Sequence, residues 1–342
     1  MYKLKYILLK VMGYLLYFTG IYYALDKIFN NKGLYILMYH RISDRNDNSY
    51  FQDISVKKEE FEKQLQFFTK KYCCISMSEA ISIIKQNGRM NKNYVVFTFD
   101  DGYRDNITHG ALLTSKYNIR PIVYITAGKI ETNTPIWTEI IDYVLLNSKK
   151  KHIDIDINGI KIKGNIKDKK GLYAFADEIK GTLKKVPQKE IRKHIIDLNK
   201  ICETNIDTIN NELLNWESIY ELKKMGWEIG SHTLNHVNLA LETENIILGE
   251  IIKSRELIEN RLKCEVEHFA YPFGKSCHYN QFAINEISAN YKSAVTTILG
   301  TNTCKDNVYL LRRIAIGNHH SLCDIKVRLL ISKIRNVLKF NR

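Results

Sequence analysis

Short apolar segments with β-type composition alternate with longer segments of helical period, and this alternation constrains the fold more than any other feature. Strands are expected at residues 34–39, 94–99 and 121–125, and helices between them at 58–71, 78–86 and 107–117. The pattern is typical of an α/β fold built from a largely parallel sheet or barrel. A chain of 342 residues is long enough to enclose a large core of this kind.

The alternation weakens over about residues 130–214 and then resumes. Helices are expected at 216–225 and 244–262, and strands at 226–230, 269–271, 293–297 and 310–316. Within the irregular region, residues 152–157 have strand-like alternation and lead to a hairpin turn at Asn158 and Gly159. We interpret this region as an insertion that borders the functional site. The predicted organisation is a membrane-associating helix at 1–30, one domain at 31–320 with the insertion at about 130–214, and a basic amphipathic helix at 321–342.

Polar residues directly follow several of these strands, and in parallel α/β sheets and barrels the carboxyl ends of the strands carry the functional site. Asp100 and Asp101 end one apolar run, and buried adjacent carboxylates repel each other unless a cation intervenes. His232 and His236 follow another strand at a spacing that places both on one face of a helical turn.

Two imidazoles and one carboxylate form the ligand set of a catalytic divalent ion. Asp101, His232 and His236 fit that set, with Zn²⁺ the first choice of metal. Asp100 is then left beside the ion, where it is placed to accept a proton from the attacking water as a general base. The residues therefore predict a metal-dependent hydrolase.

Three segments, in this order, resemble the first three motifs of the polysaccharide deacetylase family, also called the NodB homology domain or carbohydrate esterase family 4. They are residues 98–102 (Thr-Phe-Asp-Asp-Gly), 231–236 (Ser-His-Thr-Leu-Asn-His) and 271–274 (Tyr-Pro-Phe-Gly). The resemblance covers about residues 33–316. It implies a distorted (β/α) barrel with fewer than eight strands, and an oxyanion site formed by a backbone N–H of the third motif, at Phe273 or its neighbours Tyr271 and Gly274.

The chain departs from the family pattern at two positions. Many members carry an arginine that holds the general base where this chain has Ala270, so that role has no assigned residue. Arg312 or Arg313 could hold a carboxylate near the site, with a plain surface pair as the alternative. The usual C-terminal histidine is also missing. Residues 37–42 instead resemble the circularly permuted branch of the family, which makes His40 the general acid; the alternative is a histidine that merely caps its strand.

Two aromatic residues, Trp137 and Tyr271, are candidates to stack on a sugar ring. Core packing is the commoner role of such side chains, and it remains the alternative for both.

The charge and the two ends of the chain favour an anionic surface as a partner. The formal net charge is +14, but no nucleic-acid-binding signature is present, so no nucleic-acid partner is expected. Residues 11–25 carry no charge and are flanked by lysines, which suits a helix in a membrane interface, with a spanning helix or a helix packed on the domain as alternatives. Residues 325–339 predict a basic amphipathic helix that binds an anionic leaflet or packs beside the N-terminal helix.

These observations predict a bacterial, membrane-associated deacetylase. Its expected reaction is removal of acetyl groups, N-acetyl groups first, from a cell-surface polysaccharide or a lipid-linked glycolipid precursor. The alternative is a catalytically inactive, membrane-docked carbohydrate-binding protein, a reading that the missing arginine makes conceivable.

Overall fold

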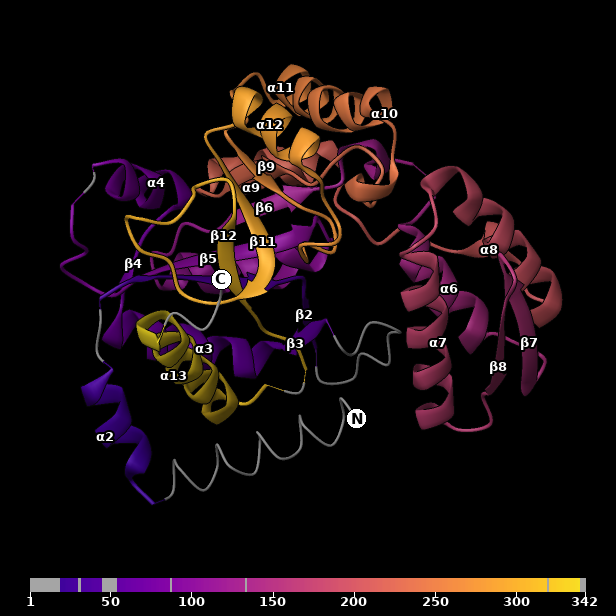
Figure 1. Cartoon of the computed structure of the whole chain (residues 1–342), viewed down its shortest axis with the longest axis horizontal. Coiled ribbons are helices and arrows are strands. Elements are labelled where there is room, and N and C mark those ends of the chain that lie inside the picture. Colours follow the sequence, from indigo (N-terminus) through magenta and orange to yellow (C-terminus); the bar gives the residue numbers. More distant parts are fainter. Residues whose placement is uncertain are drawn as a thin grey trace.

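A closed barrel of seven parallel strands forms the centre of the molecule (Figure 1). The computed structural model describes residues 19–29, 32–44, 54–86, 88–132, 134–318 and 320–338. The strand order is β1-β12-β11-β10-β9-β6-β5, and pairing of β1 with β5 closes the barrel. The strands are β1 (Leu34–Tyr39), β5 (Tyr94–Asp101), β6 (Ile122–Ile125), β9 (Glu228–Ser231), β10 (His268–Ala270), β11 (Ser293–Leu299) and β12 (Leu311–Ala315). The expected distorted barrel with fewer than eight strands is confirmed.

Three short strands and most of the helices lie around this barrel. The strands are β4 (Cys73–Cys74), which extends the sheet beside β5, and the pair β2 (Arg41–Ser43) and β3 (Ser55–Lys57). The helices are α3 (Lys58–Lys71), α4 (Met77–Lys85), α5 (Leu112–Lys116), α9 (Trp216–Lys224), α10 (Glu244–Leu248), α11 (Ser254–Leu262) and α12 (Gln281–Asn290). Short 3₁₀ segments are η2 (Ala127–Lys129), η3 (Ile206–Thr208) and η4 (Leu239–Leu241), and π-helical segments are η1 (Asn106–Ala111) and η5 (Gly249–Lys253).

Both faces of the barrel strands are buried, which explains why they appear in the sequence as continuous apolar runs. In β1 every residue is buried. Tyr35 and Leu37 pack in one hydrophobic cluster with the outer helix α3, whereas Leu34 and Ile36 share another cluster with α4. Helix α4 therefore covers the amino-terminal mouth of the barrel, and the carboxyl ends of the strands face the opposite side of the molecule (Figure 1).

The insertion folds as a unit with its own hydrophobic core at that opposite side. It consists of α6 (Trp137–Leu146), the hairpin β7 (His152–Ile157) and β8 (Ile160–Asn165), α7 (Lys169–Leu183) and α8 (Gln188–Cys202). The expected turn is present, with Asn158 and Gly159 at φ 51° and 86°. Strand β7 alternates exposed and buried residues, and its buried face packs with α6, α7 and α8.

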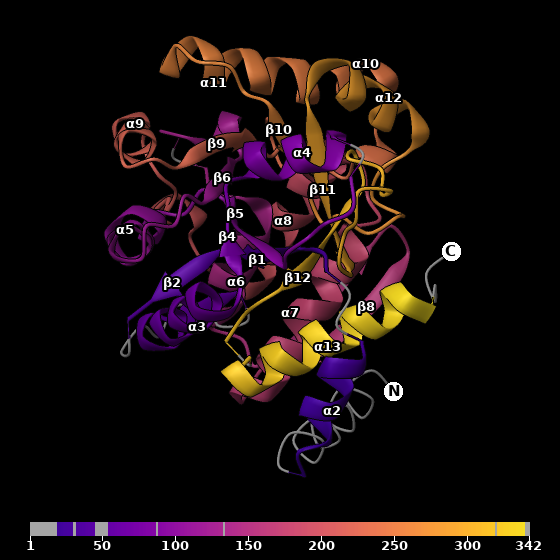
Figure 2. The same cartoon turned by 90° about the vertical axis from the view of Figure 1, so that its left-hand side faces the viewer.

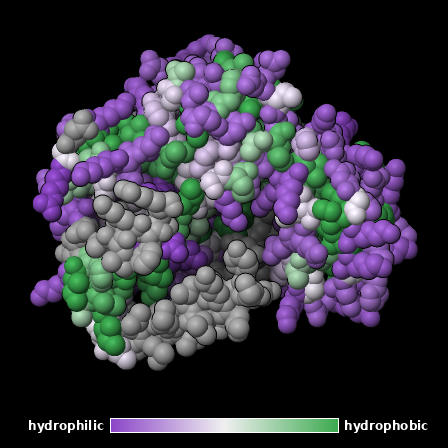
Figure 3. Space-filling model, in the orientation of Figure 1, coloured by the Kyte–Doolittle hydropathy of each residue, from purple (hydrophilic) through white to green (hydrophobic). Residues whose placement is uncertain are grey.

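The two ends of the described chain meet on the outside of the barrel. Helix α13 (Leu322–Leu338) packs beside α2 (Ile21–Ile28), and buried Lys333 Nζ lies 2.6 Å from Asp26 Oδ1 (Figure 2). Ile21, Tyr23 and Ile28 of α2 are exposed, and apolar surface is visible at the lower left of Figure 3, where α2 lies. Residues 1–18, which carry most of the predicted membrane helix, lie outside the described residues. Among the helices of the described ranges, none has the length and apolar character that crossing a bilayer requires.

Substitution of Ile179 by alanine tests whether the insertion depends on its own core. The side chain is fully buried in the insertion cluster, so Ile179→Ala should lower the free energy of unfolding by about 2–5 kcal/mol. Denaturant unfolding monitored by circular dichroism measures this loss. Ile160→Ala is the matched control, because Ile160 is 53% exposed and its truncation should change stability little. Equal effects of the two substitutions would contradict the assignment of this core.

Candidate active site

The carboxylate pair lies at the end of β5, where the chain turns sharply. Asp101 has a φ of 73°, and Gly102 follows at 86°, a conformation that glycine adopts without steric penalty. A Cβ at Gly102 would lie 2.9 Å from Ile125 Cγ2, so close packing also requires glycine here. The turn leaves Asp100 and Asp101 adjacent, both buried and both lining one cavity. The Asp-Asp-Gly sequence therefore combines a turn with the placement of two carboxylates.

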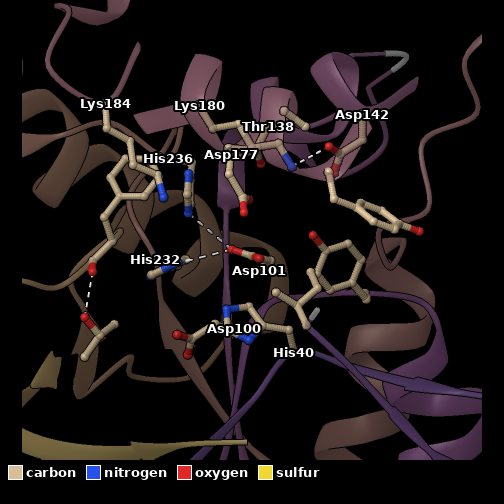
Figure 4. Close-up of a pocket in the computed structure, with 16 residues that line it drawn as sticks. His40, Asp100, Asp101, Thr138, Asp142, Asp177, Lys180, Lys184, His232 and His236 are labelled. Carbon is tan, nitrogen blue, oxygen red and sulfur yellow. Dashed lines mark hydrogen bonds and ion pairs between the residues drawn. The ribbon is translucent and has the colours of Figure 1, made fainter. Parts of the chain in front are cut away.

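His232 and His236 follow β9 in a loop, and the predicted helical turn is wrong. Thr233 and His236 have φ values of 65° and 58°, which interrupt any right-handed helix. The two imidazoles nevertheless converge, with ring centroids 5.0 Å apart. Each Nε2 lies 3.4 Å from Oδ1 of Asp101 (Figure 4). The loop geometry thus brings together the three residues that the sequence grouped as metal ligands.

These three side chains fit a divalent ion. Their ligand atoms all lie within 4.8 Å of one another. Ligand bonds of about 2.0–2.2 Å in a tetrahedron separate ligand atoms by about 3.3–3.6 Å, and the observed spacing of 3.4 Å agrees. Oδ1 of Asp101 is buried and has no hydrogen-bond partner among the described residues.

The protonation states of the three side chains are consistent with the same fit. His232 Nδ1 lies 2.7 Å from the carbonyl of Ala270, which accepts its hydrogen bond and leaves Nε2 free for a metal. Burial lowers the pKa of His236 well below its ordinary value, so its imidazole is neutral, the form that binds metals. Burial and the charges of Asp100 and Glu139 raise the pKa of Asp101, so a cation is needed to keep it ionised.

Arg313 of β12 binds the carboxylate of Asp100. It makes the contact that an arginine at the position of Ala270 makes in many members of the family that the sequence resembles. Its Nη1 and Nη2 each donate to one carboxylate oxygen of Asp100 at 2.7 Å, a bidentate pair with both side chains buried. Nε donates to the carbonyl of Thr296, and Nη1 also donates to Thr98. Burial alone would raise the pKa of Asp100, but Arg313 outweighs it and, with His232 and His40, lowers the pKa to about 2. Of the two candidate arginines, Arg312 lies instead beside Asp306, near the surface.

His40 follows β1 and lines the same cavity, next to Asp100 (Figure 4). Its backbone carbonyl accepts a hydrogen bond from Asn106, so the backbone rather than the imidazole makes the contact at the strand end. Burial lowers the pKa of His40 to about 4, a shift that Asp100 opposes and Arg313 adds to. The imidazole is therefore neutral in the resting protein and is available to take up a proton and pass it on.

The third motif contributes its backbone and one aromatic ring. The amide groups of Tyr271 and Gly274 donate to the carbonyls of Val295 and Pro272. The amide of Phe273, by contrast, has no such acceptor within the described part of the chain. The Phe273 ring packs edge-on against His236, with centroids 4.7 Å apart.

Two predicted sugar contacts are not supported by the positions of their side chains. Tyr271 is fully buried, and its hydroxyl donates to the carbonyl of Tyr309. Trp137 is 4% exposed and packs in the insertion core against Phe273. Both rings therefore serve the core, the alternative that the sequence left open, because neighbouring elements cover the faces that a sugar would need.

The insertion supplies a wall of the cavity, as the sequence predicted, but the sequence did not identify the residues that form this wall. Asp142 of α6, with Asp177, Lys180 and Lys184 at the end of α7, faces the metal-ligand group across the cavity (Figure 4). Lys180 Nζ lies 2.5 Å from Asp142. Lys184 Nζ lies 4.9 Å from the centre of the Phe273 ring, and burial lowers its pKa. These residues lie in charged helices without a motif, so only the folded chain shows that they belong to the site.

Comparisons with known proteins agree with this site. The family model for polysaccharide deacetylases matches residues 179–294, which include both histidines and the third motif. YxkH of Bacillus subtilis (strain 168), assigned to the polysaccharide deacetylases, is 21% identical over 284 residues, or 82% of this chain and 71% of its own.

Solved structures share the fold. The Streptococcus pyogenes deacetylase PplD in complex with acetate has a TM-score of 0.57 at 19% identity, over 86% of this chain and 97% of its own. IcaB from Ammonifex degensii has a TM-score of 0.56 at 14% identity, over 88% and 97%. The chain therefore contains a polysaccharide deacetylase domain of the NodB, or carbohydrate esterase family 4, type.

A double-mutant cycle tests the pair between Asp100 and Arg313. Arg313→Met leaves a buried carboxylate without its partner and should lower the free energy of unfolding by about 3–5 kcal/mol. The additional substitution Asp100→Asn should recover part of this loss, which urea unfolding would detect as a positive coupling energy. Because the folded pKa of Asp100 is lowered to about 2 from 3.8, the stabilisation is present above pH 3.8 and is lost as the pH falls through 2.

The neighbouring Arg312 provides the control for this cycle. It makes a partly exposed ion pair with Asp306, so Arg312→Met should change stability by about 0–1 kcal/mol. A loss in Arg313→Met no larger than that of Arg312→Met would contradict the proposed importance of the buried pair.

Proposed function

We propose that this protein is a metal-dependent deacetylase that removes N-acetyl groups from a bacterial cell-surface polysaccharide or its lipid-linked precursor. Members of its family are hydrolases acting on amide bonds. The proposal is based on one observation, which is that a single cavity contains two buried carboxylates with different partners. Asp101 lies within reach of two histidines that suit a divalent ion, and Asp100 is held by Arg313. A relative's description as a de-N-acetylase, from Aggregatibacter actinomycetemcomitans, supports the choice of an N-acetyl group.

The residues of the chain have separate roles in this mechanism. When bound by Asp101, His232 and His236, a divalent ion such as Zn²⁺ would polarise the acetyl carbonyl and make water more acidic. Asp100, kept ionised and oriented by Arg313, accepts the proton of the attacking water. The N–H of Phe273, which has no backbone acceptor among the described residues, is the candidate donor to the developing oxyanion. His40, which lies beside Asp100 in the same cavity, takes up the proton that Asp100 has accepted and passes it to the departing amine, so that hydrolysis yields acetate and a free amino sugar.

The inactive alternative loses its main support in the structure. It rested on the absence of an arginine at position 270, and Arg313 makes the bidentate contact from another strand. Neutral imidazoles, a paired base and an accessible cavity are the features expected of a working hydrolytic site rather than of a binding protein.

A membrane surface is proposed as the place where the enzyme meets its substrate. The exposed Ile21, Tyr23 and Ile28 of α2 provide apolar side chains, and the adjacent α13 carries Lys326 and Arg328. Exposed apolar side chains together with basic residues favour binding at the interface of an anionic leaflet. The net charge of +14 acts in the same direction.

Acetate release from N-acetylated glucosamine oligosaccharides tests the proposed reaction. The wild-type protein should release acetate, lose that activity with a chelator and regain it when Zn²⁺ is restored. Asp100→Asn should lower kcat by about 10²–10⁴-fold, because the proton acceptor is lost. Asp154→Asn, an exchange on the exposed side of the hairpin, is the control and should behave as wild type. Full activity of Asp100→Asn, or activity that survives complete metal removal, would refute the mechanism.

Lys184 is proposed to bind the polysaccharide at the insertion side of the cavity. Within the described chain its ammonium group has no carboxylate at ion-pair distance, whereas Lys180 is paired with Asp142. Lys184→Gln should raise KM about tenfold with little change in kcat, which corresponds to loss of one charge-assisted hydrogen bond. Lys185→Gln is the matched control, because Lys185 is adjacent, exposed and outside the cavity. An unchanged KM in Lys184→Gln would exclude this contact.

A further inference from the structure

One helix near the site contains an irregular turn that the mechanism so far does not use. Helices α10 and α11 are continuous through η5, a π-helical segment at Gly249–Lys253. A π-helical turn accommodates an extra residue and redirects the side chains around it, and such turns are frequent at functional sites. Glu250 lies in this segment, and it is only 5% exposed although its side chain is charged.

The buried carboxylate of Glu250 is directed at the loop that carries the two histidines. Its Oε2 accepts hydrogen bonds from the backbone amides of Leu234 at 2.9 Å and Asn235 at 2.8 Å. Its Oε1 accepts one from Nδ2 of Asn235 at 2.8 Å, and the Thr233 hydroxyl is a further partner. One side chain from another helix thus satisfies several donors between His232 and His236.

Thr233 connects this carboxylate to a metal-ligand candidate. Its Oγ1 accepts a hydrogen bond from the backbone amide of His236 at 2.9 Å. The Thr233 hydroxyl is therefore bonded to Glu250 on one side and to the His236 backbone on the other. The position of the His236 ring depends on that backbone, so Glu250 is linked to it through a single intervening residue.

The loop needs such support because its backbone is strained. Thr233 and His236 have positive φ values of 65° and 58°, and conformations of this kind cost about 1–3 kcal/mol each for residues other than glycine. On the side away from Glu250, Ala127 and Gly128 donate to the carbonyls of Thr233 and Leu234 at 3.1 and 2.8 Å. The loop is therefore held on two sides, with Glu250 as its only charged anchor among the described residues.

We infer that Glu250 is a positioning residue of the metal centre. It stabilises the strained loop in the conformation that directs both imidazoles at Asp101, and it thereby sets the affinity of the site for a divalent ion. The inference rests on the metal site of the proposed function and is independent of the substrate. Residues that orient metal ligands typically change metal affinity by about 10–100-fold when substituted.

Zn²⁺ affinity of the full-length, metal-stripped protein tests this inference. Glu250→Gln keeps the size of the side chain but replaces one acceptor oxygen by an NH₂ group that opposes the loop donors. It should weaken Zn²⁺ binding at least tenfold in competition with a chromophoric chelator, and should alter the visible absorption of bound Co²⁺. Glu256→Gln, on the same helical run but exposed, is the control and should bind both ions as wild type does.

A second substitution keeps the test decisive if Glu250→Gln does not fold. Thr233→Val preserves the β-branched shape but removes the hydroxyl that links Glu250 to His236, and it should weaken Zn²⁺ binding severalfold. The inference would be overturned if both folded variants had the Zn²⁺ affinity and the Co²⁺ spectrum of the wild type. If only Thr233→Val folds, wild-type values in that variant would overturn it as well. If the wild type itself binds no Zn²⁺, the proposed function fails; if it binds Zn²⁺ and releases no acetate, only the reaction is refuted.

Discussion

Two adjacent aspartates are buried at one mouth of the barrel, and each requires its own positive charge. Burial disfavours both carboxylates in the ionised form, and their proximity makes simultaneous ionisation harder still. The fold solves half of this problem with Arg313, which neutralises Asp100 through two hydrogen bonds. Within the described part of the chain, Asp101 has no comparable cation at ion-pair distance and faces two neutral imidazoles instead. In the proposed mechanism, this asymmetry makes Asp100 the proton acceptor and Asp101 the metal ligand.

The closed barrel allows the neutralising arginine to come from a distant part of the sequence. Asp100 and Arg313 are 213 positions apart, yet β1 alone separates β5 from β12 around the barrel. Side chains that point inward from nearby strands reach the same layer of the interior. An arginine on β12, as in this chain, can therefore reach the same carboxylate as an arginine at the end of β10, the position of Ala270, but from a different side. In this chain the carbonyl of Ala270 orients His232.

Short-range patterns predicted a parallel α/β sheet or barrel and the grouping of the chemical residues, and the family resemblance then implied the barrel. Apolar runs identified the strands, and the carboxyl ends of parallel strands necessarily meet. The helical turn at His232 and His236 was wrong, because a spacing of four residues does not reveal that Thr233 and His236 adopt positive φ. Glu250 and Lys184 could not be predicted, since a π-helical turn and a folded insertion bring them to the site. Arg313 was one of two equal candidates until the barrel order placed it beside Asp100.

The barrel and the insertion form opposite walls of the cavity, and Phe273 lies between them. The barrel supplies the carboxylates and imidazoles, whereas α6 and α7 of the insertion supply charged groups on the opposite wall. The Phe273 ring contacts His236 on one side and lies near Trp137 and the Lys184 ammonium on the other. Its carbonyl accepts a hydrogen bond from the Thr297 hydroxyl, so the backbone at Phe273 is held by the barrel rather than by the insertion. Under the proposed function, changes in the insertion should therefore alter which polymer is bound while the barrel residues proposed to carry out hydrolysis keep their positions.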